Sequence, residues 1–445
     1  MTTNKSFSTY FLFPVILLLF LLLSACSTTR SLRRDLNKER SNTENMSRGF
    51  TGFVLYDAGS EKTIFEHNAG KYFTPASNIK LFTFYAGLQT LGDSVPAIRY
   101  AARNDSLIFK ATGDPSFLNP DLPDSGLLEF LKNREEQLFY LKPTYTEEAF
   151  GPGWAWDDYN YAFSAERVPF PIYGNKLKVI FKEDNPLPST NPSFFKNMIS
   201  AEEDSLKNYR GIRRELFSND FTYIQKESRK NSEETVPFIY SEKLFLKLLS
   251  DTLQREIHLI KGLPQKWQLS TSYYGIATDS LYKRMLRQSD NLIAEQILLL
   301  ASESIADTLK SDIAIDFIKK NHLKSLPDEP VWVDGSGLSR YNLVTPRSIV
   351  KLLEKIQNKV NWERLTALLA TGGQSGTLKN SFKAKEAFVF AKTGSMSNNY
   401  SLSGYVKTDN GKILIFSFMN SNFTADSELL RKQIEQILLF IKDNY

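Results

Sequence analysis

The sequence predicts an α+β protein in which both ends of the chain build one sheet and a long, mostly β segment is inserted between them. Three observations support this class. Two apolar segments flank a turn near the N-terminus, and a second such pair near the C-terminus precedes an amphipathic helix. Between them, from about residue 91 to 263, short strand-like segments, prolines and aromatic residues dominate. Strands at both ends with helices between them are typical of layered α+β domains.

Composition bounds the possible functions. The chain has 445 residues, of which 42% are hydrophobic and 13% aromatic, so it can form two or more domains with sizeable cores. Its net charge is only +5, and no dense basic cluster with interleaved aromatic residues occurs. We therefore expect no nucleic-acid partner.

The N-terminus has the features of a lipoprotein signal. Lys5 precedes an apolar run from Tyr10 to Leu23, which is shorter than the ~20 residues that span a bilayer. The run ends in Leu-Ser-Ala-Cys, which resembles the lipobox of bacterial lipoproteins and makes Cys26, the sole cysteine, the lipidated residue. We expect a signal peptide over residues 1–25 and a polar tether over residues 26–48; an uncleaved membrane anchor is the alternative.

The first chemical motif opens a helix. After the predicted hairpin of residues 53–65, Pro75 marks a helix start and an apolar stripe follows to Leu91. Ser77 and Lys80 lie three residues apart and thus on one helical face. A serine hydroxyl needs a base, and a buried neutral lysine can serve. Alternatively, Ser77 caps the helix and Lys80 is solvated.

Two further motifs follow in order. Ser289-Asp290-Asn291 precedes a helical pattern, and Lys392-Thr393-Gly394 ends an apolar strand. Residues 402–406 and 413–418 then flank Thr-Asp-Asn-Gly, a strong hairpin signal, and residues 426–442 form the closing helix. We therefore assign residues 49–92 and 264–445 to a catalytic domain, and residues 93–263 to a mostly β inserted domain.

S-x-x-K, S-D-N and K-T-G in this order form the set typical of penicillin-binding proteins and class A β-lactamases. With its long insertion, the chain resembles the D-alanyl-D-alanine carboxypeptidase/endopeptidase family, the class C low-molecular-mass penicillin-binding proteins, over residues 50–440. The resemblance implies a penicillin-recognising (β-lactamase/transpeptidase-like) domain. Five further blocks look like those of the family: KATGDPSF (Lys110–Phe117), GPGWAWDDYNYAFSA (Gly151–Ala165), VPF (Val236–Phe238), DGSGLSRYN (Asp334–Asn342) and SGTL (Ser375–Leu378).

The resemblance implies a role for each catalytic residue. Ser77 would attack the substrate carbonyl, and Lys80 would take the serine proton. Ser289 would relay a proton to the leaving amine, while Asn291 would hold Lys80 and the substrate amide.

It also implies the substrate contacts. Lys392 would attract a substrate carboxylate and help to keep Lys80 neutral, and Thr393 and Ser395 would add hydroxyl groups. Ser395 stands where the family commonly has threonine. Gly394 would leave room for substrate beside the strand. Backbone N–H groups of Ser77 and Ser395 would form the oxyanion hole.

One specificity residue is expected in the insertion. Trp154-Ala155-Trp156-Asp157-Asp158 places two aromatic residues beside two carboxylates. The resemblance implies that Asp157, or less surely Asp158, pairs with the free ammonium of a diamino acid in the stem peptide. The alternative is that the tryptophans are core residues and the aspartates cap a turn.

The expected function is a serine-type D-Ala-D-Ala carboxypeptidase/DD-endopeptidase that acts on peptidoglycan stem peptides in the periplasm or cell envelope and that β-lactam antibiotics inhibit covalently. We expect neither a cofactor nor a metal. A serine β-lactamase is one alternative, but the nearest candidate for its deacylating glutamate, Glu215, lies in the insertion without the expected sequence around it. A non-catalytic peptidoglycan-binding lipoprotein is another alternative, although the nucleophile and base positions are intact.

Overall fold

A computed structural model describes residue 34 and residues 49–445, apart from residues 184, 203–210, 225–230 and 425. The predicted signal peptide, Cys26 and nearly all of the predicted tether lie outside the described residues. Within the described part of the chain, no helix has the length and apolar character needed to cross a membrane.

The central sheet confirms that both ends of the chain pair with each other. Its six strands have the order β14-β15-β16-β17-β1-β2, and the first strand, β1, pairs antiparallel with the last, β17. Both predicted hairpins are present, β1 with β2 and β16 with β17. The strands are β1 Phe50–Asp57, β2 Lys62–His67, β14 Ala370–Thr371, β15 Val389–Met396, β16 Asn399–Lys407 and β17 Ile413–Ser421.

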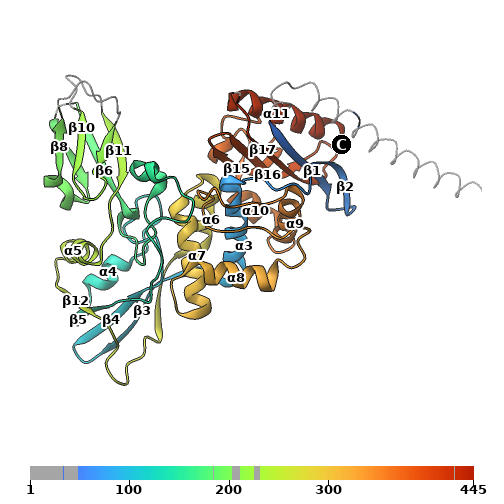
Figure 1. Cartoon of the computed structure of the whole chain (residues 1–445). Coiled ribbons are helices and arrows are strands. Elements are labelled where there is room, and N and C mark those ends of the chain that lie inside the picture. Colours follow the sequence, from blue (N-terminus) through green and yellow to red (C-terminus); the bar gives the residue numbers. More distant parts are fainter. Residues whose placement is uncertain (1–33, 35–48, 184, 203–210, 225–230, 425) are drawn as a thin grey trace, which may run out of the picture.

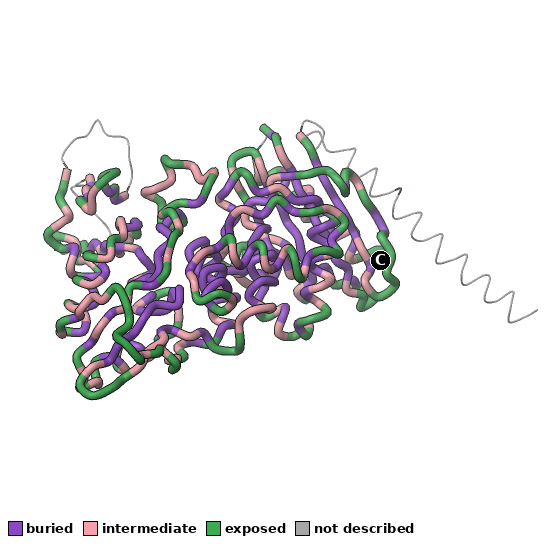
Figure 2. The backbone as a smooth tube through the Cα atoms, turned by 60° about the horizontal axis from the view of Figure 1, so that its bottom comes forward, coloured by how far each residue is buried: buried purple, intermediate pink, exposed green. Residues whose placement is uncertain are grey.

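Helices cover both faces of this sheet (Figure 1). The predicted closing helix, α11 (Ser427–Asn444), packs its apolar side on one face. On the other face lie α3 (Lys80–Thr90) and α9 (Pro346–Gln357), followed by the helices that surround them. These are α6 (Thr278–Arg287), α7 (Asn291–Ala306), α8 (Ser311–His322) and α10 (Trp362–Leu368). The buried chain is concentrated in this layered body (Figure 2).

The insertion contains three sheets of its own. One has five strands in the order β12-β5-β4-β3-β13, and two have three strands each, β8-β10-β9 and β11-β6-β7. Its strands are β3 Ser94–Arg103, β4 Ser106–Ala111, β5 Gln137–Leu141, β6 Lys176–Lys182, β7 Asn185–Asn191, β8 Ile199–Glu202, β9 Ile212–Arg214, β10 Phe221–Ile224, β11 Ser232–Pro237, β12 Ile257–Ile260 and β13 Thr271–Ala277. The helices are α4 (Leu127–Lys132) and α5 (Glu242–Leu253).

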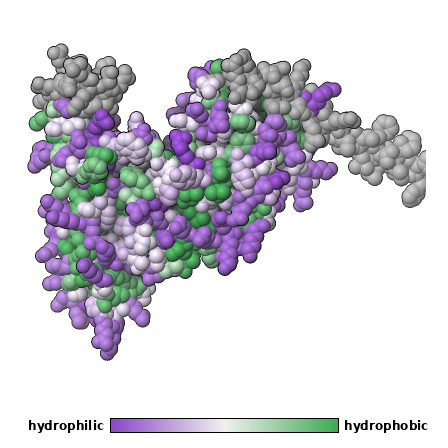
Figure 3. All heavy atoms as spheres, viewed as in Figure 1, coloured by the Kyte–Doolittle hydropathy of each residue, from purple (hydrophilic) through white to green (hydrophobic). Residues whose placement is uncertain are grey.

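The sheet of the insertion extends beyond the predicted boundary at residue 263. Strand β13 pairs antiparallel with β3, the first strand of the insertion, and leads directly into α6. The chain therefore leaves and re-enters the catalytic body through two neighbouring strands. A separate apolar cluster, rich in phenylalanine, fills this lobe, and the surface is hollowed between the lobe and the catalytic body (Figure 3).

Candidate active site

Ser77 and Lys80 meet at the start of the first long helix. Ser77 lies in a short 3₁₀ turn, η1 (Ala76–Ile79), and Lys80 is the first residue of α3. The Lys80 Nζ donates to the Ser77 Oγ at 2.9 Å. The lysine side chain has no exposed surface. This excludes the alternative of a solvated lysine and provides the contact that proton transfer requires.

The second motif approaches the same lysine from α7. Asn291 is the first residue of α7, and its Oδ1 accepts from the Lys80 Nζ at 2.6 Å. Its Nδ2 donates to the carbonyl of Phe163 in the insertion at 2.9 Å. Asp290 caps the helix by accepting from the backbone N–H of Ile293. The asparagine amide therefore bridges the catalytic body and the inserted lobe.

The third motif completes the group. Lys392 lies on β15 and is fully buried, and its Nζ donates to the Ser289 Oγ at 2.9 Å. It also donates to the carbonyl of Thr393 at 2.6 Å. The motifs therefore form two hydrogen-bonded sets, one made of Ser77, Lys80 and Asn291 and the other of Ser289 and Lys392, and the charge of Lys80 acts on Lys392.

Charge is unevenly distributed around the two lysines. Burial lowers the pKa of Lys80 to about 8, although the carboxylates of Asp334, Glu295 and Asp290 partly oppose that shift. Burial, and secondly the charge of Lys80, holds the pKa of Lys392 well below its usual value. Lys392 and the carboxylates therefore act on Lys80 in opposite directions: a positive charge on Lys392 disfavours the ammonium form of Lys80, whereas the three carboxylates favour it.

Gly394 has a packing role that the sequence did not show. A Cβ at this position would lie 2.5 Å from the carbonyl oxygen of Pro75 and 3.0 Å from the backbone nitrogen of Ser77. Glycine is required because β15 packs directly against the turn that carries the nucleophile. Beside this turn, β14 pairs with β15 only at Phe390 and Ala391, so the backbone of β15 has no strand partner on that side at the K-T-G positions.

The hydroxyl groups on β15 have neighbours that the sequence did not identify. The Thr393 Oγ1 donates to the Thr377 Oγ1 at 2.8 Å, and Thr377 belongs to the SGTL block. An Nη2 of Arg431 on α11 approaches the Ser395 Oγ at 3.5 Å. Thr377 had a signal in the resemblance of its block, whereas Arg431 had none.

The two tryptophans of the WAWDD segment have opposite environments. Trp154 donates from Nε1 to the buried Asp334 at 2.8 Å, so it helps to hold the DGSGLSRYN loop in place. Trp156 is 76% exposed and begins a 3₁₀ helix, η2 (Trp156–Asn160), that also holds both aspartates. Asp157 is exposed and Asp158 is half-buried. Burial, and secondly the charge of Asp157, raises the pKa of Asp158.

The DGSGLSRYN loop lies directly against the candidate base and nucleophile. The carbonyl of Ser336 accepts a hydrogen bond from the Lys80 Nζ. Gly337 has a φ of +81°, and a Cβ there would lie 2.0 Å from the carbonyl oxygen of Ala76. Only glycine fits this contact, so the loop is held against the turn that carries Ser77.

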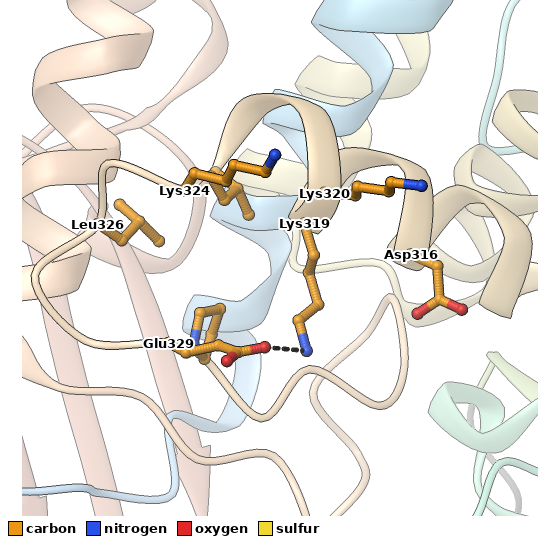
Figure 4. A pocket seen from close by; sticks show the side chains of 8 residues that line it. Asp316, Lys319, Lys320, Lys324, Leu326 and Glu329 are labelled. Atoms are coloured by element: carbon orange, nitrogen blue, oxygen red, sulfur yellow. Dashed lines mark ion pairs between the residues drawn. The ribbon is translucent and has the colours of Figure 1, made fainter.

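A cavity of about 620 Å³ lies elsewhere, along α8 and the loop after it (Figure 4). Its charged lining includes Lys319 and Glu329, which form an ion pair at 2.9 Å. The residues recorded along this cavity do not include those of the three motifs, so it is separate from the candidate active site.

Comparisons with solved structures identify the fold. The structure is similar to that of penicillin binding protein 4 (dacB) from Haemophilus influenzae, with a TM-score of 0.72, 19% identity, and coverage of 92% of this chain and 99% of that one. The complex of the same protein with a β-lactam gives a TM-score of 0.68 at 18% identity, with the same coverage. The predicted penicillin-recognising α+β fold is thereby confirmed.

Sequence comparisons identify the family. The chain is 22% identical over 424 residues to D-alanyl-D-alanine carboxypeptidase DacB from Haemophilus influenzae, across 86% of this chain and 88% of that protein. It is 24% identical over 448 residues to penicillin-sensitive carboxypeptidase A from Dictyostelium discoideum, across 86% and 84%. The family model of D-Ala-D-Ala carboxypeptidase 3 (S13) matches residues 32–194 and 277–443. Because these matched segments make up most of the chain, the protein belongs to the D-Ala-D-Ala carboxypeptidase 3 (S13) family.

Proposed function

We propose that this D-Ala-D-Ala carboxypeptidase cleaves peptidoglycan stem peptides through an acyl-enzyme on Ser77. The observation that supports this assignment is the direct contact of the Lys80 Nζ with the Ser77 Oγ at 2.9 Å. A buried lysine with a pKa of about 8 supplies a neutral base to a useful fraction of molecules near neutral pH. The S13 family relationship supplies the reaction class.

In the acylation step, the Ser77 Oγ forms a bond to the penultimate D-alanine carbonyl while its proton passes to the Lys80 Nζ. The C–N bond then breaks, and the departing D-alanine nitrogen receives through Ser289 the proton that Lys80 took from Ser77. The Lys392–Ser289 hydrogen bond of 2.9 Å connects this relay to the lysine that faces the terminal carboxylate. Water then attacks the ester and releases the shortened peptide.

Substrate binding determines which of the two lysines carries the positive charge. A terminal carboxylate beside Lys392 stabilises its ammonium form, and that positive charge in turn disfavours a proton on Lys80. Binding of the correct substrate thereby prepares the base. Thr393 and Ser395 contribute hydroxyl groups to the same carboxylate, and the backbone N–H groups of Ser77 and Ser395 receive the developing oxyanion.

One experiment separates this function from its alternatives. Purified enzyme is mixed with a fluorescent penicillin and, separately, with a pentapeptide that ends in D-Ala-D-Ala. Stable covalent label and released D-alanine are expected. Rapid turnover of the penicillin would instead indicate a β-lactamase, and loss of both reactions would indicate a wall-binding protein.

The same cleft is proposed to cleave cross-links as a DD-endopeptidase, which fits the class C low-molecular-mass group. The edge of β15 is open beyond Ala391, so an extended peptide has room to continue past the scissile bond. A cross-linked dimeric peptide in the same assay should give two monomers. Unchanged dimer alongside active pentapeptide cleavage would limit the enzyme to carboxypeptidase activity.

The enzyme acts in the cell envelope, and we propose that Cys26 anchors it there through a lipid. The support is the Leu-Ser-Ala-Cys sequence after an apolar run. Cys26→Ser should prevent lipid attachment, and globomycin should block processing of the unmodified chain. A Cys26→Ser protein that is still processed and still membrane-bound would indicate another anchor.

A further inference from the structure

Behind the general base lies a buried carboxylate for which the proposed reaction has no use. Glu295 is on α7, four residues after Asn291, and has no exposed surface. Its Oε1 accepts from the backbone N–H of Ser336 at 2.7 Å. The carbonyl of the same Ser336 residue accepts from the Lys80 Nζ. One residue of the DGSGLSRYN loop therefore connects Glu295 to the base.

The second oxygen of Glu295 is poorly compensated. Its Oε2 has no hydrogen-bond partner among the described residues, and the nearest cation, Arg167, is 4.0 Å away. Arg167 makes its shorter contacts elsewhere: it pairs with Glu147 at 2.8 Å and donates to the backbone carbonyls of Glu148 and Phe150. Hydrogen bonds with Ser336 and the Gly335 backbone partly stabilise the Glu295 carboxylate, yet burial still raises its pKa. A charge on Glu295 is therefore costly, and its place beside the base calls for a reason.

We propose that Glu295 is a positioning residue for the base: its carboxylate holds Ser336 so that the Ser336 carbonyl receives Lys80, and its negative charge stabilises the ammonium that forms when Lys80 takes the serine proton. This proposal rests on the assignment of Lys80 as the base. The proton passes from the Ser77 Oγ to the Lys80 Nζ, which leaves a full positive charge on a side chain without exposed surface. The carboxylate of Glu295, which is separated from Lys80 by Ser336, partly offsets that charge.

Other charged groups act on the same pair. Asp334 lies near both Lys80 and Glu295, Asp290 acts on Lys80, and Arg167 acts on Glu295. Lys392 repels Lys80 from β15. Asp334 already receives donors from Trp154, Gly337, Ser339 and Asn342. Burial, and secondly Asp334, raises the pKa of Glu295 to about 7, so the charge of Glu295 changes close to the working range of the base.

The test is the pH dependence of acylation by benzylpenicillin in Glu295→Gln. This variant keeps an acceptor for Ser336 and removes the charge. Without that charge, Lys80 should lose its proton more easily, so the rise of the rate with pH should move down by about one unit. The rate at high pH should fall by up to about tenfold. With a lower pKa, Lys80 is a weaker base and removes the Ser77 proton less readily.

Two variants make the result specific. Glu303→Gln removes another buried carboxylate of α7, which pairs with Arg99 at 2.8 Å, and should leave the pH profile unchanged. Glu295→Asp keeps the charge but withdraws it from Ser336, so its profile should keep its position while the rate falls.

A Glu295→Gln profile that coincides with that of the unmodified enzyme would overturn the proposal. If Glu295→Gln does not fold, Glu295→Asp decides, and an unchanged rate in that variant would overturn it. Continued acylation of Ser77→Ala would instead overturn the proposed function itself, so the two failures are distinguishable.

Discussion

The catalytic body and the insertion bury different kinds of side chain. In the body, Lys80, Lys392, Glu295 and Asp334 are all without exposed surface, within a few contacts of one another. In the insertion, the core is mainly apolar, with phenylalanine rings such as Phe195 packed on one another. The insertion buries charged groups too, among them Asp114, Arg167 and Arg214, but in the part of the chain that the structure describes only the body brings two buried lysines and two buried carboxylates together. Because buried charges are expensive, this cluster marks the body as the candidate centre of the chemistry.

The largest expected effect is on the nucleophile. Ser77→Ala should reduce penicillin labelling and peptide hydrolysis by roughly 10⁶-fold, the loss typical of a serine nucleophile. Circular dichroism and thermal unfolding should match those of the unmodified enzyme, because the hydroxyl is a small part of the turn. A covalent adduct on the alanine variant would show that Ser77 is not the nucleophile.

The second largest effect is expected at Lys392, the proposed contact of the substrate carboxylate. Lys392→Ala should lower kcat/KM for a D-Ala-D-Ala peptide with a free carboxylate by roughly 10²- to 10³-fold, since it removes one partner of a desolvated charge pair. The same peptide with a terminal amide should lose much less. Equal losses for the acid and the amide would exclude Lys392 as the carboxylate contact.

The insertion core should affect stability without affecting chemistry. Phe195 is fully buried and its ring centroid lies 5.2 Å from that of Phe238. Phe195→Ala should lower the free energy of unfolding by about 3–5 kcal/mol, yet change the penicillin acylation rate less than twofold. Phe82→Ala is the matched control, because Phe82 is equally buried but lies two residues after Lys80 and contacts Trp332. Phe82→Ala should lose both stability and acylation; similar acylation losses in both variants would mean that the lobes act as one unit.

The pH dependence of the unmodified enzyme reports on the buried base. Only neutral Lys80 accepts the serine proton, and its pKa is lowered to about 8. The acylation rate should therefore rise about tenfold per pH unit from pH 6 and level off above about pH 8. Penicillin carries no group that titrates in this range, so a rate independent of pH between 6 and 9 would contradict Lys80 as the base.

The smallest effect is expected at the rim of the insertion. Asp157→Asn should weaken the preference for a peptide with a free diamino-acid ammonium over its acetylated form by about tenfold, the low end for a charged hydrogen bond, because Asp157 is exposed to solvent. Asp158→Asn is the comparison, since Asp158 is half-buried in the same turn. A preference that survives both substitutions would show that this turn does not recognise the diamino-acid side chain of the peptide.

Local sequence determined the parts that depend on a few neighbouring residues. The hairpins at both ends, the helix start at Asn291 and the strand that carries Lys392 were predicted correctly, and the helix predicted near Ser77 begins at Lys80, after a 3₁₀ turn. Turn residues, helix caps and alternating apolar positions act over less than about ten residues, and the order of the three motifs predicted the family. The same information predicted that Ser77 and Lys80 share a helical face.

Tertiary structure alone decided the contacts between distant segments. The sequence could not show that Trp154 supports Asp334 while Trp156 faces solvent, or that Gly394 is required by the turn of Ser77. Nor could the sequence show that β13, which follows the predicted insertion, pairs with β3 inside it. The connection of Glu295 to Lys80 through Ser336 joins three segments far apart in the chain. No local pattern encodes such a contact, since burial and the direction of a hydrogen bond are properties of the packed whole.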